Sequence, residues 1–226
     1  MLDMRVAVLV SGGKDSALAL YRALESKHEV ACLASVIPLK EDSWMFHYPN
    51  IRLVDMFSEA VGIRLVKAES PGVKEEEVED LKRLIGRLGV EGVVTGAIAS
   101  TYQKSRVDMV CEQLGLKSIA PLWHRNPLTI LKELVELNFN AIITGVYAHG
   151  FTEEWLGKRI DARVIGALEE LSKRYGVSLV GEGGEYETLV LDGPLFKKRM
   201  EIIDAEILWK HESGCYLVKK AVLKNK

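Results

Sequence analysis

The first half of the chain alternates short apolar runs with segments in which apolar residues recur at helical spacing. The runs are mostly aliphatic, as is typical of strands buried in a parallel sheet, and cover 6–10, 30–37, 63–66 and 92–96. The segments between them predict helices over about 17–24, 51–61, 74–88 and from Thr101 onward. Strands that alternate with helices indicate an α/β fold, with a parallel sheet and flanking helices.

The pattern changes near Pro121. Asn126 followed by Pro127 predicts a helix start, since Asn is a favoured cap and Pro suits the first helical position. That helix is expected to run to about Leu137. The elements expected after it are a strand over 140–146, a long helix over 153–175 and antiparallel strands over 188–191, 201–209 and 216–223. We therefore predict a domain over residues 1–122 and a smaller C-terminal α+β domain over residues 123–226.

Ser11-Gly-Gly-Lys-Asp-Ser16 stands between the first predicted strand and the first predicted helix. Free backbone N–H groups and the positive end of a helix dipole meet at such a turn, and together they bind anions. Gly12 and Gly13 allow the backbone to approach a phosphate closely, and Ser11, Lys14 and Ser16 add donors. The motif predicts a phosphate-binding loop, although a glycine-rich turn without a ligand is the alternative.

The loop does not fit the two common nucleotide-binding patterns. A Walker A loop needs a Gly five residues before its Gly-Lys pair, where this chain has Val8, and Ser or Thr after the Lys, where it has Asp15. No Gly-x-Gly-x-x-Gly follows the strand either. Because ligands of parallel sheets lie beyond the carboxyl ends of the strands, the loop at Gly96-Ala97 is expected to meet the Ser11 loop.

A second glycine-rich segment, Gly181-Glu-Gly-Gly-Glu-Tyr-Glu-Thr188, precedes a predicted strand. Glu182 and Glu185 flank its glycine pair. Carboxylates beside a phosphate site can hold Mg²⁺, which prefers oxygen ligands, or bind and deprotonate an ammonium ion. A solvated glycine turn with exposed glutamates is the structural alternative.

Composition limits the partners and the compartment. A formal net charge of −2 gives no general attraction to nucleic acid, so no stable nucleic-acid binding is expected. The three cysteines are far apart in sequence and are expected to be buried, reduced thiols. The longest stretch without charged residues, 137–152, is shorter than a membrane span, and Asp3 and Arg5 interrupt any leader. We expect a cytoplasmic protein without membrane association.

The loop Ser11–Ser16 resembles the pyrophosphate loop of the ATP pyrophosphatases. With the segment Gly181–Asp192, and with Trp44–His47, Gly96–Ser100 and Pro121–Trp123, it resembles the diphthine–ammonia ligase family, in its compact archaeal form without extra carboxy-terminal domains. The resemblance covers essentially the whole chain. It implies an adenine nucleotide alpha hydrolase-like fold and the last step of diphthamide synthesis, in which ATP and ammonium convert diphthine on elongation factor 2 to its amide.

The resemblance also implies roles for particular residues. ATP is expected to bind at Gly96, Ala97 and the loop residues Ser11, Gly12, Gly13, Lys14, Asp15 and Ser16. Lys14 would stabilise charge on the departing pyrophosphate, and Asp15 is the candidate Mg²⁺ ligand. Glu182 and Glu185 would hold ammonium or accept its proton, with Glu187 a weaker candidate.

Two histidines are further candidates for the site, and two other functions are compatible with the sequence. His47, in an aromatic segment after the second strand, is predicted to lie at the nucleotide or acyl pocket, and His149 is a weaker candidate. Either could instead be an ordinary packed histidine. Two other functions fit the phosphate loop, an enzyme that activates RNA bases and a non-catalytic ATP-binding module. A homo-oligomer is possible.

Overall fold

The computed structural model describes residues 3–38, 50–71 and 74–226. Contacts within these residues divide into two compact units. The first comprises 3–11, 15–38 and 62–123, and the second comprises 12–14, 50–61 and 124–226. Two short segments of the first half of the sequence therefore belong to the second unit. The predicted domain boundary between residues 122 and 123 stays a prediction.

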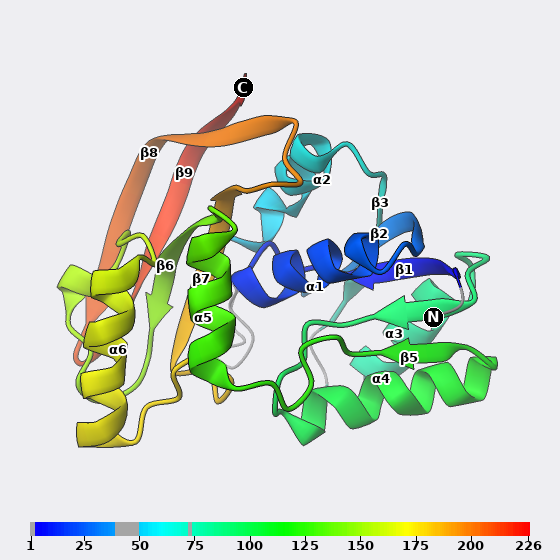
Figure 1. Ribbon diagram of the computed structural model, residues 1–226, viewed down its shortest axis with the longest axis horizontal. Coiled ribbons are helices and arrows are strands. Elements are labelled where there is room, and N and C mark those ends of the chain that lie inside the picture. Colours follow the sequence, from blue (N-terminus) through cyan, green and yellow to red (C-terminus); the bar gives the residue numbers. More distant parts are fainter. Residues whose placement is uncertain (1–2, 39–49, 72–73) are drawn as a thin grey trace. The chain divides into compact units, whose positions relative to one another are not determined.

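The first unit is built on a parallel sheet with the strand order β3-β2-β1-β4-β5 in the described residues (Figure 1). Its strands are β1 (Arg5–Leu9), β2 (Glu29–Pro38), β3 (Leu65–Ser70), β4 (Gly92–Val94) and β5 (Lys117–Ile119). Val6, Ala7 and Val8 are all fully buried, as expected for a central strand covered on both faces. Val8 pairs with Val94, so the carboxyl ends of β1 and β4 are neighbours.

The helices of the first unit are α1 (Lys14–Glu25), α3 (Lys74–Ile85) and α4 (Thr101–Leu114). Leu84 of α3 packs in one core cluster with Ala7 and Ala34 of the sheet. Val107 and other residues of α4 pack with Val93 in a second cluster, which α3 also joins. These two helices therefore cover the face of the sheet towards which Ala7 and Val93 point.

The second unit contains an antiparallel sheet with the strand order β7-β6-β9-β8 in the described residues. Its strands are β6 (Asn140–Val146), β7 (Tyr186–Asp192), β8 (Lys198–Lys210) and β9 (Ser213–Asn225). Strands β8 and β9 form one long hairpin, whereas β6 pairs with β9 only at residues 145 and 146. Strand β7 is an edge strand of this sheet.

A segment from the first half of the sequence completes this unit. It consists of η1 (Ile51–Leu53), a short 3₁₀ turn, and α2 (Val54–Val61). Just before it, the buried Asn50 side chain donates to the Tyr216 carbonyl at 2.9 Å and accepts from the Val218 N–H at 3.0 Å. Leu53 packs in the apolar core of the sheet, so this segment is an integral part of the second unit.

Helices α5 (Pro127–Glu136) and α6 (Ala162–Tyr175) lie side by side in the second unit (Figure 1). The Asn126 side chain caps α5 as predicted, accepting from the Thr129 N–H at 3.1 Å. The long helix predicted over 153–175 is wrong in its first part. Only the 3₁₀ turn η2 (Glu153–Trp155) and α6 are helical there, because residues 157–160 hydrogen-bond to β6 instead, through Gly157 and Ile160.

Other predicted boundaries moved by a few residues. Strand β3 begins at Leu65 and continues to Ser70, later than the predicted 63–66, and α3 ends at Ile85 rather than Leu88. Strand β5 was not predicted from the sequence. The fold class is confirmed, since a parallel sheet with flanking helices is followed by a C-terminal region with an antiparallel sheet.

Candidate functional site

The loops after β1 and β4 meet within the first unit. A Cβ atom placed on Gly96 would lie 2.7 Å from the carbonyl carbon of Asp15 and 2.8 Å from the backbone nitrogen of Ser16. No side chain fits at such distances, so glycine is required for the two backbones to approach each other. This confirms the expectation that the Gly96 loop meets the Ser11 loop.

The two ends of the Ser11–Ser16 loop are also tied together in this unit. The Ser11 N–H donates to the Ser16 hydroxyl oxygen at 3.3 Å, and Ser16 is buried. Asp15 is half-buried in the first turn of α1, and Ala97 is buried beside Gly96. The loop therefore lies at the amino end of α1, where the helix dipole favours an anion.

The tip of the loop, residues 12–14, belongs to the second unit and lies along β7. The Val190 N–H donates to the Gly12 carbonyl at 2.9 Å, and the Lys14 N–H donates to the Thr188 hydroxyl oxygen at 3.1 Å. Gly12 has φ +84°, a conformation that glycine adopts without strain. The tip therefore satisfies part of the free edge of β7.

The Lys14 side chain is buried in the second unit. Its ammonium group donates to the Val180 carbonyl at 2.5 Å and lies 5.0 Å from the centroid of the Tyr186 ring. The Tyr186 hydroxyl donates in turn to the Leu179 carbonyl at 2.7 Å, which holds the turn that carries Val180. The two glycine-rich motifs thus meet at Lys14.

The glutamates of the second motif differ in their contacts. The Glu185 carboxylate accepts the Gly183 N–H at 2.8 Å and the Ser178 N–H at 3.1 Å, so it fixes the glycine turn from inside. Glu182 is tied to the same turn through its backbone N–H, which lies 3.4 Å from the Ser178 hydroxyl oxygen. Glu187 is half-buried on β7.

In the first unit, Gly96 lies against the backbone of Asp15 and Ser16. In the second unit, Lys14 contacts Thr188 and the Val180 carbonyl. The catalytic and ligand-binding roles of these residues stay predictions. His47 lies outside the described residues.

The contacts that hold Lys14 were not predicted from the sequence. Thr188 and Tyr186 stood in the second motif without an assigned role, and the Val180 carbonyl had none either. A Thr and an aromatic residue directly after a glycine turn were the available signal for the first two. A backbone carbonyl gives no signal, since every residue has one.

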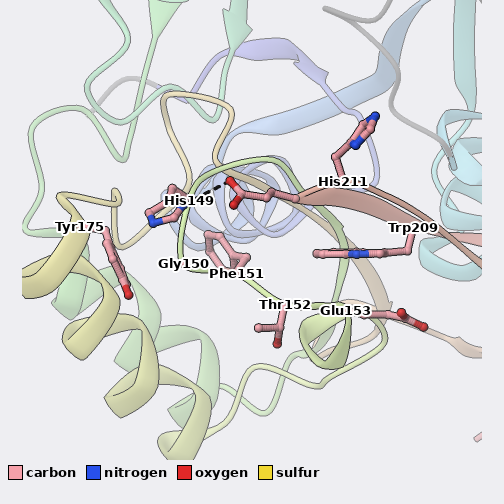
Figure 2. Close-up of a pocket in the computed structure, with 9 residues that line it drawn as sticks. His149, Gly150, Phe151, Thr152, Glu153, Tyr175, Trp209 and His211 are labelled. Atoms are coloured by element: carbon pink, nitrogen blue, oxygen red, sulfur yellow. Dashed lines mark hydrogen bonds and ion pairs between the residues drawn. The ribbon is translucent and has the colours of Figure 1, made fainter.

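His149 lines a pocket between the β6–η2 loop and the β8–β9 turn (Figure 2). Its Nδ1 atom is 3.2 Å from the Glu212 carboxylate, and its ring meets Tyr175 edge to face at 5.0 Å between centroids. His149 therefore has a carboxylate partner and an aromatic neighbour where it lines this pocket.

Among the side chains that the structure describes, those of 3–38, 50–71 and 78–226, no group of three His, Cys, Asp or Glu residues is arranged to hold a metal ion. Magnesium at Asp15 stays a prediction. None of the helices described is long and apolar enough to cross a membrane.

Comparison with known proteins assigns the family. A model of the diphthamide synthase N-terminal domain matches residues 4–118, and a model of the diphthamide synthase C-terminal domain matches residues 126–224. The chain belongs to the diphthamide synthase family. The two matches cover both of the glycine-rich motifs, the Ser11–Ser16 loop and the Gly181–Thr188 segment.

Relatives of this family member are named diphthine–ammonia ligase. The bovine protein is 38% identical, over 94% of this chain and 88% of its own length, and the human protein is 37% identical, over 91% and 85%. The protein from Schizosaccharomyces pombe is 40% identical over 99% of this chain, which spans only 40% of that longer relative.

Solved structures give more distant likenesses. One is a predicted subunit of tRNA methyltransferase from Methanocaldococcus jannaschii, with a TM-score of 0.43 and 17% identity over 74% of this chain and 87% of that one. Another is the U34-tRNA thiolase NcsA from Methanococcus maripaludis, with a TM-score of 0.37 and 15% identity, over 82% and 72% of the two chains.

Proposed function

We propose that this chain is a diphthine–ammonia ligase that converts diphthine on elongation factor 2 to diphthamide in the cytoplasm, using ATP and ammonium. Family membership and the names of the full-length relatives support the reaction class. The observation that carries the proposal is the meeting of the two glycine-rich motifs at Lys14. This contact supports the proposal because Thr188 belongs to the segment whose glutamates are predicted to bind ammonium.

The first step activates the carboxylate of diphthine. A carboxylate is a poor acyl donor because its oxygen does not leave, so one of its oxygens attacks the α-phosphorus of ATP. The bond between the α- and β-phosphates breaks, and an acyl-adenylate and pyrophosphate form. The loop amides of Gly12 and Gly13, with the hydroxyls of Ser11 and Ser16, orient the phosphates and stabilise the charge on the departing pyrophosphate.

Lys14 adds positive charge to the same region. Its ammonium group is held by the Val180 carbonyl, and its backbone N–H is held by Thr188, so both groups have a fixed direction. A fixed cation stabilises developing negative charge without reorganising during the reaction.

The second step forms the amide. The ammonium ion first gives up one proton to become ammonia. Ammonia then attacks the acyl carbon of the adenylate, the attacking nitrogen loses a second proton, and AMP leaves. Glu182 holds the ammonium ion and accepts its proton, because free ammonia is the nucleophile. Glu185 supports this arrangement by fixing the turn that carries Glu182, through its two bonds from backbone N–H groups.

Magnesium fits this site only in part. Asp15 supplies one carboxylate beside the loop, and Mg²⁺ in nucleotide sites is commonly held by one or two carboxylates together with the phosphates. When bound, the ion neutralises charge on the phosphate oxygens. The remaining contributions come from the loop and from Lys14.

The test is to supply every component and then omit each in turn. ATP, Mg²⁺, ammonium and diphthine-bearing elongation factor 2 are incubated with the protein, and AMP, pyrophosphate and the amide are measured. We expect all three products only in the complete mixture. Formation of ADP and orthophosphate, or AMP without the protein substrate at an equal rate, would contradict the proposal. Equal turnover with tRNA in place of the factor would point to the RNA-modifying alternative.

A further inference from the structure

The second unit contains a pocket to which the two proposed reaction steps assign no role. Its volume is about 450 Å³, and it lies between the loop after β6, the end of α6 and the turn between β8 and β9 (Figure 2). All of the residues that line it belong to the second unit. We call it the aromatic pocket.

Aromatic rings form much of the lining. Figure 2 shows Tyr175 on one side, Trp209 on the other and Phe151 between them. Phe151 is buried and packs edge to face on Trp155, with ring centroids 5.1 Å apart. Because Phe151 is fixed by this packing, it forms a rigid base for the pocket. Tyr175 is 39% exposed, and the Arg174 guanidinium lies 5.1 Å from the centroid of its ring.

The charged groups of the lining are carboxylates. Glu212 pairs with His149 at 3.2 Å and remains largely exposed, and Glu153 is exposed on the η2 side. Among the lining residues, all within the described part of the chain, none is Lys or Arg. The pocket therefore presents aromatic faces together with negative charge.

We propose that the aromatic pocket binds an alkylammonium group. A cation is attracted to the negative face of an aromatic ring, and quaternary ammonium ligands are recognised by aromatic cages for this reason. Glu212 and Glu153 add direct charge complementarity. A phosphate or carboxylate ligand would meet these two carboxylates and be repelled.

The pocket is connected to the Lys14 region by a chain of rings. The Phe151 ring lies 5.9 Å from the Tyr186 ring, and the Tyr186 ring lies 5.0 Å from the Lys14 ammonium nitrogen. A ligand in the pocket is thus close enough to belong to the same protein substrate. This part rests on the proposed function, and it assigns the pocket to a cationic side chain of the protein that carries diphthine.

Two sources supply such a group: the trimethylated ammonium of diphthine itself, and a lysine side chain near it. Choline is the probe for the trimethylated ammonium and butylammonium is the probe for the lysine side chain. The binding of each is measured by saturation-transfer NMR at pH 8 and constant ionic strength. The control ligand is 3,3-dimethylbutan-1-ol, which has the shape of choline without its charge. We expect choline or butylammonium to bind about fivefold or more tightly than this alcohol. The preferred cation identifies the source.

Two variants locate the binding. Glu212→Gln removes a charge from an exposed side chain, and Trp209→Leu removes one ring. We expect each to weaken cation binding severalfold. Glu206→Gln is the matched control. Glu206 lies on β8, the strand that carries Trp209, but it is outside the pocket and pairs with Lys219. It should bind the cation as the unaltered protein does.

The readouts separate this proposal from the proposed function. Three results would overturn the proposal that the aromatic pocket binds an alkylammonium group, whatever the ligase assay gives. They are equal binding of cation and alcohol, absence of cation binding, and unchanged cation binding in both variants. If the ligase assay succeeds, Trp209→Leu should raise KM for the protein substrate and leave KM for ATP unchanged. If the ligase assay fails, cation binding still decides whether the pocket is an ammonium site.

Discussion

The backbone N–H of Lys14 donates a hydrogen bond of 3.1 Å to the hydroxyl oxygen of Thr188, 174 positions further along the chain. Beside it, the Val190 N–H donates to the Gly12 carbonyl. The tip of the Ser11–Ser16 loop is therefore fixed by the edge of β7 and by a side chain from the second glycine-rich motif. If this loop binds ATP as proposed, changes on β7 should alter nucleotide binding.

Thr188→Val is the direct test of this relationship. Valine has nearly the same shape as threonine but accepts no hydrogen bond, and loss of such a partner costs about 1–3 kcal/mol. We expect kcat/KM for ATP to fall on the order of tenfold, and the melting temperature to fall by roughly 2–4 °C per kcal/mol lost. Thr188→Ser keeps the acceptor and should retain most of the activity. A similar fall of kcat/KM in both variants would show that the Thr188 hydroxyl is not needed for activity.

Gly96→Ala should disrupt the contact between the two loops of the first unit. The added Cβ would lie 2.7 Å from the Asp15 carbonyl carbon, so one backbone has to move. We expect weaker ATP binding, measured by calorimetry, together with a lower melting temperature. Gly166→Ala is the matched control, since a Cβ there meets nothing within 4 Å and lies inside α6. It should raise stability by up to about 1 kcal/mol.

Lys14→Ala removes the buried cation at the meeting point of the motifs. By comparison with the loss of one preorganised donor in an oxyanion site, the rate of pyrophosphate release should fall about 10²–10³-fold. Lys104→Ala is a suitable control, because Lys104 also lies over an aromatic ring, that of Trp123, at 5.4 Å. Unchanged turnover in a folded Lys14→Ala protein would refute the assignment of Lys14.

The two glutamates of the second motif should respond differently to substitution by glutamine. In Glu185→Gln an amide NH₂ replaces one of two oxygens that accept backbone N–H groups, so we expect the melting temperature to fall, by roughly 2–4 °C per kcal/mol. Glu182 is tied to the turn by its backbone N–H, which the substitution leaves in place. Glu182→Gln should therefore raise KM for ammonium without loss of stability. If Glu185→Gln raises KM for ammonium and Glu182→Gln lowers the melting temperature, then Glu185 is the ammonium ligand and Glu182 stabilises the turn.

Cys111 should make stability depend on pH in the alkaline range. Burial, assisted by the charge of Asp108, raises the pKa of its thiol from 9.0 to about 11. Between these values the folded protein binds more protons than the unfolded chain, so stability present below pH 9 is lost as the pH rises towards 11. The slope is up to about 1.4 kcal/mol per pH unit. Urea titrations at pH 8, 9 and 10 should show a shallower decline for Cys111→Ala, and an equal decline would contradict this.

Much of the fold could be predicted because the buried strands are uninterrupted apolar runs. Val6–Val10 is one such run, and it forms the central strand of the first sheet. Strand β5 could not be predicted this way, because its three residues, Lys117–Ile119, are exposed or half-buried. The helix expected from residue 153 failed for another reason, since a non-local partner, β6, takes the backbone hydrogen bonds of residues 157 and 160.

The candidate site was predictable to the extent that glycine marks it. Gly12 and Gly96 stand where the backbone has positive φ or approaches another backbone, and no other residue serves equally well there. The partners of Lys14 could not be predicted, because the Val180 carbonyl has no distinguishing side-chain chemistry. Pairing between positions so far apart in sequence is decided by tertiary structure alone.

Residues 50–61 contact the C-terminal hairpin through Asn50. They also contact the segment just before the hairpin through Phe57, whose ring meets Phe196 edge to face at 5.3 Å. During synthesis on a ribosome these residues emerge long before their partners. Leu53, Val54 and Phe57, all buried in the finished protein, stay exposed to water until residues 196–218 have been translated. The nascent chain thus offers an apolar stretch to chaperones for most of its translation, and a ribosome that stalls before the hairpin releases an aggregation-prone product.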